Sequence, residues 1–180
     1  MKSKIIAISS IGAGFTAICL TLGAYIEAMD LISLVLASVF VVMPLYFNSY
    51  KGAFLCFGAG GVIAFMLSGF NIFSVVFPAY FLFFGLYPIL KALSVEKRVN
   101  VIVCRIIGLV WSVLVVYGIY YYYVYVMNFN FNDLPSWASF ITDNITIFIG
   151  IFGVIFYFVY DRYVVVTKRV VDYYLYKAIK

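Results

Sequence analysis

Histidine is missing from the 180 residues of this chain, and so is the Gly-Lys dipeptide. Without imidazole the sequence has no Ser-His-Asp or Cys-His nucleophile system, no HExxH zinc site and no histidine-ligated haem. The missing Gly-Lys pair excludes the phosphate-binding loop of P-loop ATPases, so any energy from ATP must come from another protein. We therefore expect no catalytic residues, no metal site and no cofactor, and we predict that the protein is not an enzyme.

The three cysteines, Cys19, Cys56 and Cys104, are far apart in the sequence and form no CxxC motif. They lie in or beside apolar segments, which is typical of free thiols packed in an apolar interior and not of a redox pair. The carboxylates Asp133 and Asp143 form no recognisable acid–base pair either. An integral-membrane enzyme is accordingly the weakest of the functional classes that we consider.

Charged residues are also scarce, at 11% of the chain, whereas 67% of the residues are hydrophobic. Soluble domains have about 25% charged and roughly 45–50% apolar residues, because polar side chains must cover the core. The apolar residues here, about 121 in number, suffice for six spans at about 20 residues per span. The composition thus predicts a small polytopic membrane protein. We assign the net charge of +5 to membrane orientation and expect no nucleic-acid partner.

Uninterrupted apolar runs locate the spans at about residues 5–26, 31–47, 52–70, 72–90, 99–127 and 141–160. The short connections between most of the runs make neighbouring helices antiparallel. We therefore predict an all-α fold in which six transmembrane helices form one bundle. Residues 1–180 are expected to form a single integral membrane domain, with residues 161–180 as a cytoplasmic tail. The second run is short and contains Pro44 near its end, so it either spans with little tilt or is partly re-entrant.

The basic residues predict the orientation of the bundle. With the N-terminus inside, all twelve Lys and Arg residues fall on the cytoplasmic side, as the positive-inside rule requires. We predict that both termini are cytoplasmic and that the protein is a multi-pass protein of the cell membrane, most consistent with a bacterial plasma membrane. Arg105 is the charge embedded in an apolar run, where it either has a function or extends back to the inner headgroups.

Small residues recur at four-residue intervals in two spans. The third span carries Gly52, Cys56, Gly60, Ala64 and Ser68, and the first span carries Ser9, Ala13, Ala17 and Thr21. In a bilayer, small residues let helix backbones approach closely, so each stripe predicts a helix–helix contact. The contact is either with another helix of the same bundle or with a partner protein.

The outer side of the predicted bundle is rich in amides, acids and aromatic residues. Residues 128–137 form the longest outer connection and are a candidate lid. The side chains that we predict to contact a substrate are Glu27, Asp30, Asn71, Asn130, Asp133, Trp137, Asp143 and Asn144. Because this side has acids and no bases, a neutral or cationic organic ligand fits it better than an anion. Tyrosines from Tyr117 to Tyr125 approach the same boundary, either as part of the site or as an aromatic belt.

Two segments carry a family resemblance. Ala13-Gly14-Phe15-Thr16-Ala17 matches an AxxxA pattern, and Gly85-Leu86-Tyr87-Pro88-Ile89-Leu90-Lys91 ends the fourth predicted span. With its size and six spans, the chain resembles the substrate-binding S components of energy-coupling factor (ECF) vitamin transporters. The resemblance implies capture of a small organic nutrient from outside. It also implies three partners, a transmembrane coupling subunit and two ATPase subunits, with Ser9, Ala13 and Ala17 docking the coupling subunit.

A different class of protein fits the same pattern. Six-span proteins of this size also act as scaffolds of cell-envelope or cell-shape machinery, as the rod-shape protein MreD does. In that interpretation the small-residue stripes are the functional surfaces, and the outer connection binds no solute. Both hypotheses place the chain among membrane lipids and give it protein partners. They differ in whether a small molecule binds.

The predicted orientation has a direct test. A reporter domain fused after Lys180 should be found on the cytoplasmic side of the membrane, because six spans return the chain to the side on which it began. Protease protection in intact cells and in inverted vesicles reads out the side. A reporter that is digested in intact cells contradicts the predicted number of spans or their direction.

Overall fold

The computed structural model describes residues 2–71, 73–126 and 144–179. Its α-helices are α1 (Lys2–Tyr25), α2 (Asp30–Val42), α3 (Tyr50–Leu67), α4 (Val76–Ala79), α5 (Leu86–Glu96), α6 (Val101–Tyr125) and α8 (Ile145–Ile179). Short 3-10 turns, η1 (Glu27–Met29) and η2 (Met43–Phe47), and a π turn, η3 (Tyr80–Phe84), connect or extend them. These described residues contain no strand. The predicted all-α class is therefore confirmed.

Six helical segments are long and apolar enough to cross a membrane. They are Ser3–Tyr25, Asp30–Phe47, Tyr50–Leu67, Val76–Glu96, Val101–Tyr125 and Ile145–Lys177. The prediction of six apolar spans is confirmed, which is compatible with a multi-pass membrane protein. The side of the membrane that the termini face, and the membrane itself, stay predictions.

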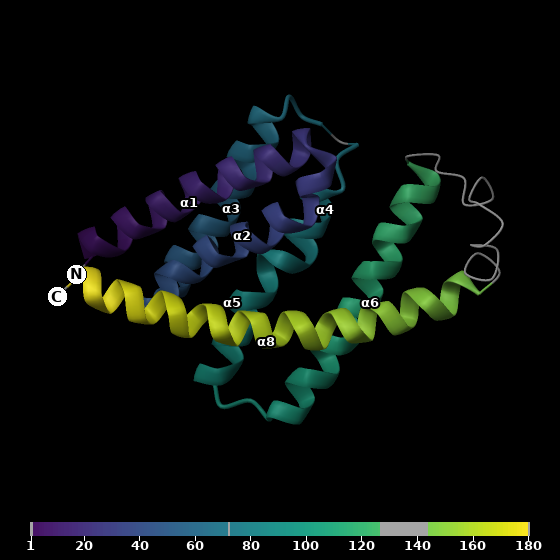
Figure 1. The fold of residues 1–180 in the computed structure, drawn as a ribbon. Helices are drawn as coiled ribbons and strands as arrows, with labels where there is room; N and C mark the ends of the chain where they lie inside the picture. The colour runs from purple at the N-terminus through teal and green to yellow at the C-terminus, as the bar shows by residue number, and fades with distance from the viewer. Residues whose placement is uncertain (1, 72, 127–143, 180) are drawn as a thin grey trace.

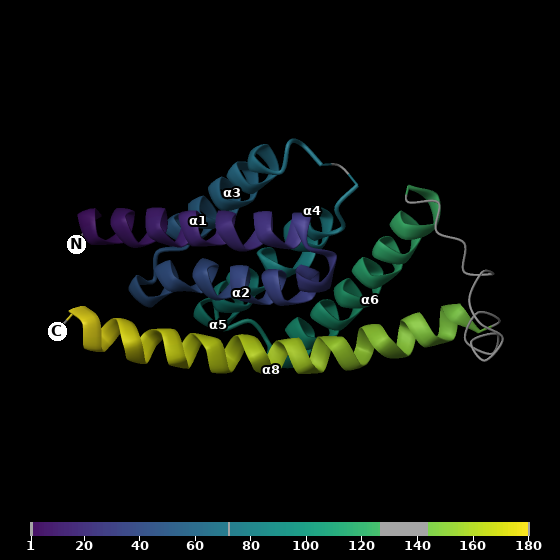
Figure 2. The same cartoon turned by 45° about the horizontal axis from the view of Figure 1, so that its top comes forward.

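Helices α1, α2 and α8 lie side by side, and the start of α1 and the end of α8 lie at the same end of the molecule (Figures 1 and 2). The most extensive helix contacts are those of α1 with α3 and with α2. Helix α6 diverges from α1, α2 and α3 in both views and packs mainly against α8. This crossing uses glycines, because a Cβ on Gly108 would lie 2.8 Å from the Tyr157 ring, and one on Gly153 would lie 3.2 Å from Val113.

Proline shapes the second span. Helix α2 ends at Val42, and the chain continues as the 3-10 turn η2 with Pro44 near its start. Proline has no N–H for the carbonyl four residues earlier, which is that of Phe40. The thiol of Cys56 donates to this carbonyl across 3.6 Å, and the backbone N–H of Met43 also bonds to it. The span thus changes helix type at Pro44 and continues to Phe47.

The fourth span begins at Val76 and reaches Glu96, later at both ends than residues 72–90. Within it, the π turn η3 ends where the Gly85 N–H bonds to the Tyr80 carbonyl at 2.9 Å. Pro88 leaves the Phe84 carbonyl without its helical partner, and the Tyr160 hydroxyl of α8 donates to that oxygen at 2.8 Å. Side chains of other helices therefore complete the hydrogen bonding of this irregular span.

The last span is one continuous helix of 35 residues, Ile145–Ile179. At 1.5 Å per residue it is about 52 Å long, well beyond a hydrocarbon core of ~30 Å. Its buried face continues past Tyr160 through Val164, Thr167 and Val171. Residues 161–179 thus extend the helix and pack on the bundle, and their position on the cytoplasmic side stays a prediction.

Both small-residue stripes lie inside the bundle, where α1 meets α3. Ser9, Ala13 and Ala17 are buried, with Ala17 only 2% exposed. A Cβ on Gly60 would lie 2.7 Å from the Thr16 methyl group and 3.1 Å from the Ala13 carbonyl oxygen. The close contact that the spacing predicts is therefore present, and the chain's own α3 occupies this face of α1.

This contact predicts different effects for two alanine substitutions on α3. Gly60→Ala should destabilise the protein by about 1–3 kcal/mol, because the added methyl group overlaps with Thr16 and the α1 backbone. Gly58→Ala is the matched control, since a Cβ there meets no atom within 4 Å. Unfolding in detergent, followed by circular dichroism, measures both. Equal stability of the two variants contradicts close packing at Gly60.

Candidate functional site

A cavity of about 220 Å³ lies between α2, the irregular fourth span, α6 and α8. Its lining consists of Asp30, Leu31, Leu34, Val75, Ala79, Phe83, Phe84, Ser112, Val115, Val116, Ile119, Tyr123, Phe152 and Phe156. Ligand sites are typically apolar and aromatic with a few placed polar groups, and this lining has that character. A 150 Å³ apolar cavity holds benzene, so this one has room for a slightly larger compact solute.

Asp30 supplies the carboxylate of the cavity. It is the first residue of α2, and the Ser33 hydroxyl donates to its backbone carbonyl at 2.8 Å. Tyr123 lines the cavity from the last two turns of α6. In an alternating six-span order, the start of α2 and the end of α6 lie on the same side of the bundle. The polar groups of the cavity thus lie toward the side predicted to be outer.

Aromatic rings form the opposite wall. Phe84 and Phe156 both line the cavity and pack against Tyr160, with ring centroids 5.0 and 5.9 Å away. Phe83 stacks on Tyr87 at 5.3 Å and contacts Tyr160 at 5.1 Å. All five side chains come from η3, α5 and α8. They form a continuous aromatic layer, which we call the aromatic floor.

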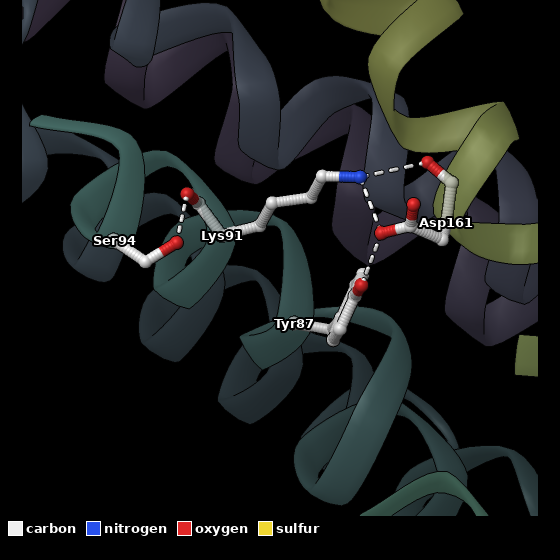
Figure 3. A network of polar contacts seen from close by, with 4 residues as sticks. All are labelled: Tyr87, Lys91, Ser94 and Asp161. Carbon is white, nitrogen blue, oxygen red and sulfur yellow. Dashed lines mark hydrogen bonds and ion pairs between the residues drawn. The ribbon is translucent and has the colours of Figure 1, made fainter. Parts of the chain in front are cut away.

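Beneath the aromatic floor lies an ion pair between α5 and α8 (Figure 3). The Lys91 ammonium group donates to the Asp161 carboxylate and also to the Asp161 backbone carbonyl, the latter at 2.9 Å. The Tyr87 hydroxyl donates to the same carboxylate oxygen. Ser94 completes the group, since its hydroxyl donates to the Lys91 carbonyl at 2.8 Å.

Asp161 lies near the middle of the long helix α8. Sixteen helical residues precede Asp161 in α8 and eighteen follow it, about 24 and 27 Å at 1.5 Å per residue. The side chains of Lys91 and Asp161 are 21% and 18% exposed. Partly buried charges are costly unless they are paired, and charges inside membrane proteins mark functional sites. Arg105 is exposed on α6, and its charge acts on Asp161 from outside the pair.

The structure brings only part of the predicted substrate-binding set to the cavity. Asp30 lines it, whereas the described residues Asn71 and Asn144 do not. The Asn71 side chain accepts the Phe73 N–H at 3.1 Å within its own turn, and the Asn144 carbonyl accepts the N–H groups of Ile147 and Phe148 in α8. Glu27 begins the 3-10 turn η1. The remaining candidates, Asn130, Asp133, Trp137 and Asp143, lie outside the described residues.

Sequence analysis missed Tyr87, Lys91 and Asp161 as site residues, although each had a local signal. Lys91 follows Tyr87 by four residues, so both side chains lie on one face of α5. Asp161 directly follows an apolar run, and we interpreted it as the start of a tail. The helix continues through this position, and Asp161 pairs there with Lys91 of α5.

A second hollow, an open groove of about 490 Å³, lies between α6 and α8. Its lining is Tyr117, Thr146, Ile147, Gly150, Ile151, Val154 and Ile155. The Tyr117 hydroxyl is already bonded to the Thr146 carbonyl at 2.6 Å. The groove is larger than the cavity but contains no ionisable acid or base, so the cavity with Asp30 is the better candidate for a solute.

Comparisons with protein-family models, with curated proteins and with solved structures found no match to this chain. Among the described residues, no group of three or more Cys, Asp and Glu side chains is arranged to hold a metal ion. The features that bear on function are therefore the cavity, its aromatic floor and the ion pair beneath it.

The aromatic floor generates a stability prediction. Tyr160→Phe keeps the ring but removes the hydroxyl that satisfies the Phe84 carbonyl, so it should destabilise the protein by about 1–3 kcal/mol. Tyr173→Phe is the control, because Tyr173 is 63% exposed on the same helix. Thermal unfolding of both variants in one detergent gives the comparison. A Tyr160→Phe variant as stable as the parent contradicts this role of the hydroxyl.

Proposed function

We propose that this protein is a membrane-embedded binding protein that captures a small organic solute in the cavity beside Asp30. The observation that carries the proposal is a cavity of about 220 Å³ that combines one carboxylate with an aromatic and aliphatic lining. Such a lining takes up a compact solute by burying its apolar surface, and the few polar groups orient it. The solute is neutral or cationic, because the ionisable side chain of the lining is an acid.

The resemblance to ECF S components supports a role in uptake. In this proposal the protein lies in the bacterial plasma membrane with both termini in the cytoplasm, and a coupling subunit with two ATPases supplies the energy. The docking face implied for Ser9, Ala13 and Ala17 is filled by α3, since these side chains are buried. A coupling subunit would therefore dock on another face or displace α3.

The scaffold hypothesis loses its suggested surfaces for the same reason. Its functional faces were the two small-residue stripes, and both are buried where α1 meets α3. A scaffold also has no need of a cavity that contains a carboxylate, or of a partly buried ion pair beside it. The binding protein accounts for both features, so it is the function that we favour.

A cavity-filling substitution tests the proposal. Val116 lines the cavity, whereas Leu114 is 59% exposed on another face of α6. Val116→Trp should lower solute binding at least about tenfold, because the indole ring occupies the space of the solute. Leu114→Trp adds the same ring toward lipid and should bind normally.

Purification from native cells identifies the bound compound together with its site. Tagged protein is isolated in mild detergent, and mass spectrometry identifies small molecules and proteins in the eluate. A compound that is stoichiometric with the parent and with Leu114→Trp, but lost from Val116→Trp, supports the proposal. Recovery of cell-envelope proteins without any such compound supports the scaffold instead.

A further inference from the structure

The cavity is closed on the side opposite Asp30 by two successive layers. The first is the aromatic floor, in which Phe83 lines the cavity and stacks on Tyr87. The second is the ion pair, because Tyr87 also donates to the carboxylate that Lys91 binds. One run of α5 thus contributes to both layers, and Asp161 of α8 lies opposite (Figure 3). Any solute that leaves on this side must pass both.

The backbone between the cavity and the ion pair is irregular. The π turn η3, Gly85 and Pro88 all lie between Ala79 and Lys91. π turns and prolines are the places where helices bend. The turn is held from outside, since Trp111 of α6 donates to the Leu82 carbonyl at 2.8 Å. Helix α5 also packs on α2, α3 and α6, and the irregular backbone above it lets it shift relative to α8 when the Lys91–Asp161 contact is released.

Lys91–Asp161 is the charged contact between that unit and α8. A charged pair with low exposure holds its helices together more strongly than a surface pair, and it separates only when each charge gains another partner or water. The two side chains are partly exposed, at 21% and 18%. The pair is therefore either formed or separated, which suits a gate between α5 and α8 that is either closed or open.

We propose that the Lys91–Asp161 ion pair is the inner latch of the cavity. The proposal rests on the function proposed above, because it takes the cavity as the solute site. While the latch is closed, α5 holds Phe83 and Tyr87 in the aromatic floor and the solute enters only from the side of Asp30. When the latch opens, the Tyr87 ring moves away with α5, Phe83 of η3 loses its stacking partner, and the cavity opens to the opposite side for release.

Thiol accessibility in oriented membrane vesicles tests the latch. Val116→Cys places a thiol in the cavity lining. A membrane-impermeant cationic methanethiosulfonate is added to right-side-out or inside-out vesicles, and mass spectrometry of the peptide that contains position 116 gives the labelling rate. The rates are compared in the parent, in Asp161→Asn, in Lys91→Met and in the exchanged pair K91D/D161K. Arg162→Gln is the control, since it removes an exposed charge next to Asp161.

With the latch intact, labelling should proceed from the outer side and be at least about tenfold slower from the inner side. Asp161→Asn and Lys91→Met should each raise the inner-side rate about tenfold or more. Loss of the ion pair turns the inward-open conformation from a minor state into a well-populated one. K91D/D161K should restore slow inner-side labelling, and Arg162→Gln should leave it unchanged. Thermal unfolding confirms that each variant is folded before it is labelled.

The latch is overturned if folded Asp161→Asn and Lys91→Met label from the inner side as slowly as the parent. It is also overturned if Arg162→Gln raises the rate equally, or if the exchanged pair stays open. Failure of the proposed function has a different signature. In that case the thiol at position 116 is not reached from the outer side even in the parent, and the eluate contains no bound compound.

Discussion

Backbone hydrogen bonding without water is the constraint on which the rest of this structure depends. In a hydrocarbon environment an unsatisfied carbonyl costs several kcal/mol, so every break in a helix must be repaired by another part of the chain. Pro44 and Pro88 each deprive a carbonyl of its helical partner, and the repairs come from Cys56 of α3 and Tyr160 of α8. The irregular places in the spans are thereby the places where helices are joined to one another.

This constraint also explains why the candidate site lies where it does. The π turn η3 rotates Phe83 and Phe84 relative to a regular helix, and both rings line the cavity. The Tyr160 hydroxyl that completes the backbone of η3 belongs to a ring of the aromatic floor. One turn beyond Pro88, Lys91 reaches Asp161 on α8. The irregular backbone at η3, the aromatic wall of the cavity and the Lys91–Asp161 pair are thus in contact with one another.

Charge has two roles in this protein, and they are physically distinct. Basic residues near helix ends predict orientation, because the anionic inner surface of a membrane attracts them without a specific partner. The charges of Lys91 and Asp161 are instead partly buried and contact each other directly, so removal of one leaves the other unpaired. A lysine counted only as a loop charge in the sequence thereby becomes part of an inter-helix contact.

The sequence by itself determined the all-α class and the six apolar spans, because composition and run length are local properties. Its four-residue spacing of small residues predicted close helix contacts without deciding between the chain's own helices and a partner protein. Only the tertiary structure decided that Lys91 of α5 meets Asp161 of α8, that Asn71 and Asn144 lie away from the cavity, and that Ala13 and Ala17 face α3. Each of these depends on which helices become neighbours, and such contacts join residues up to 128 positions apart that no local pattern connects.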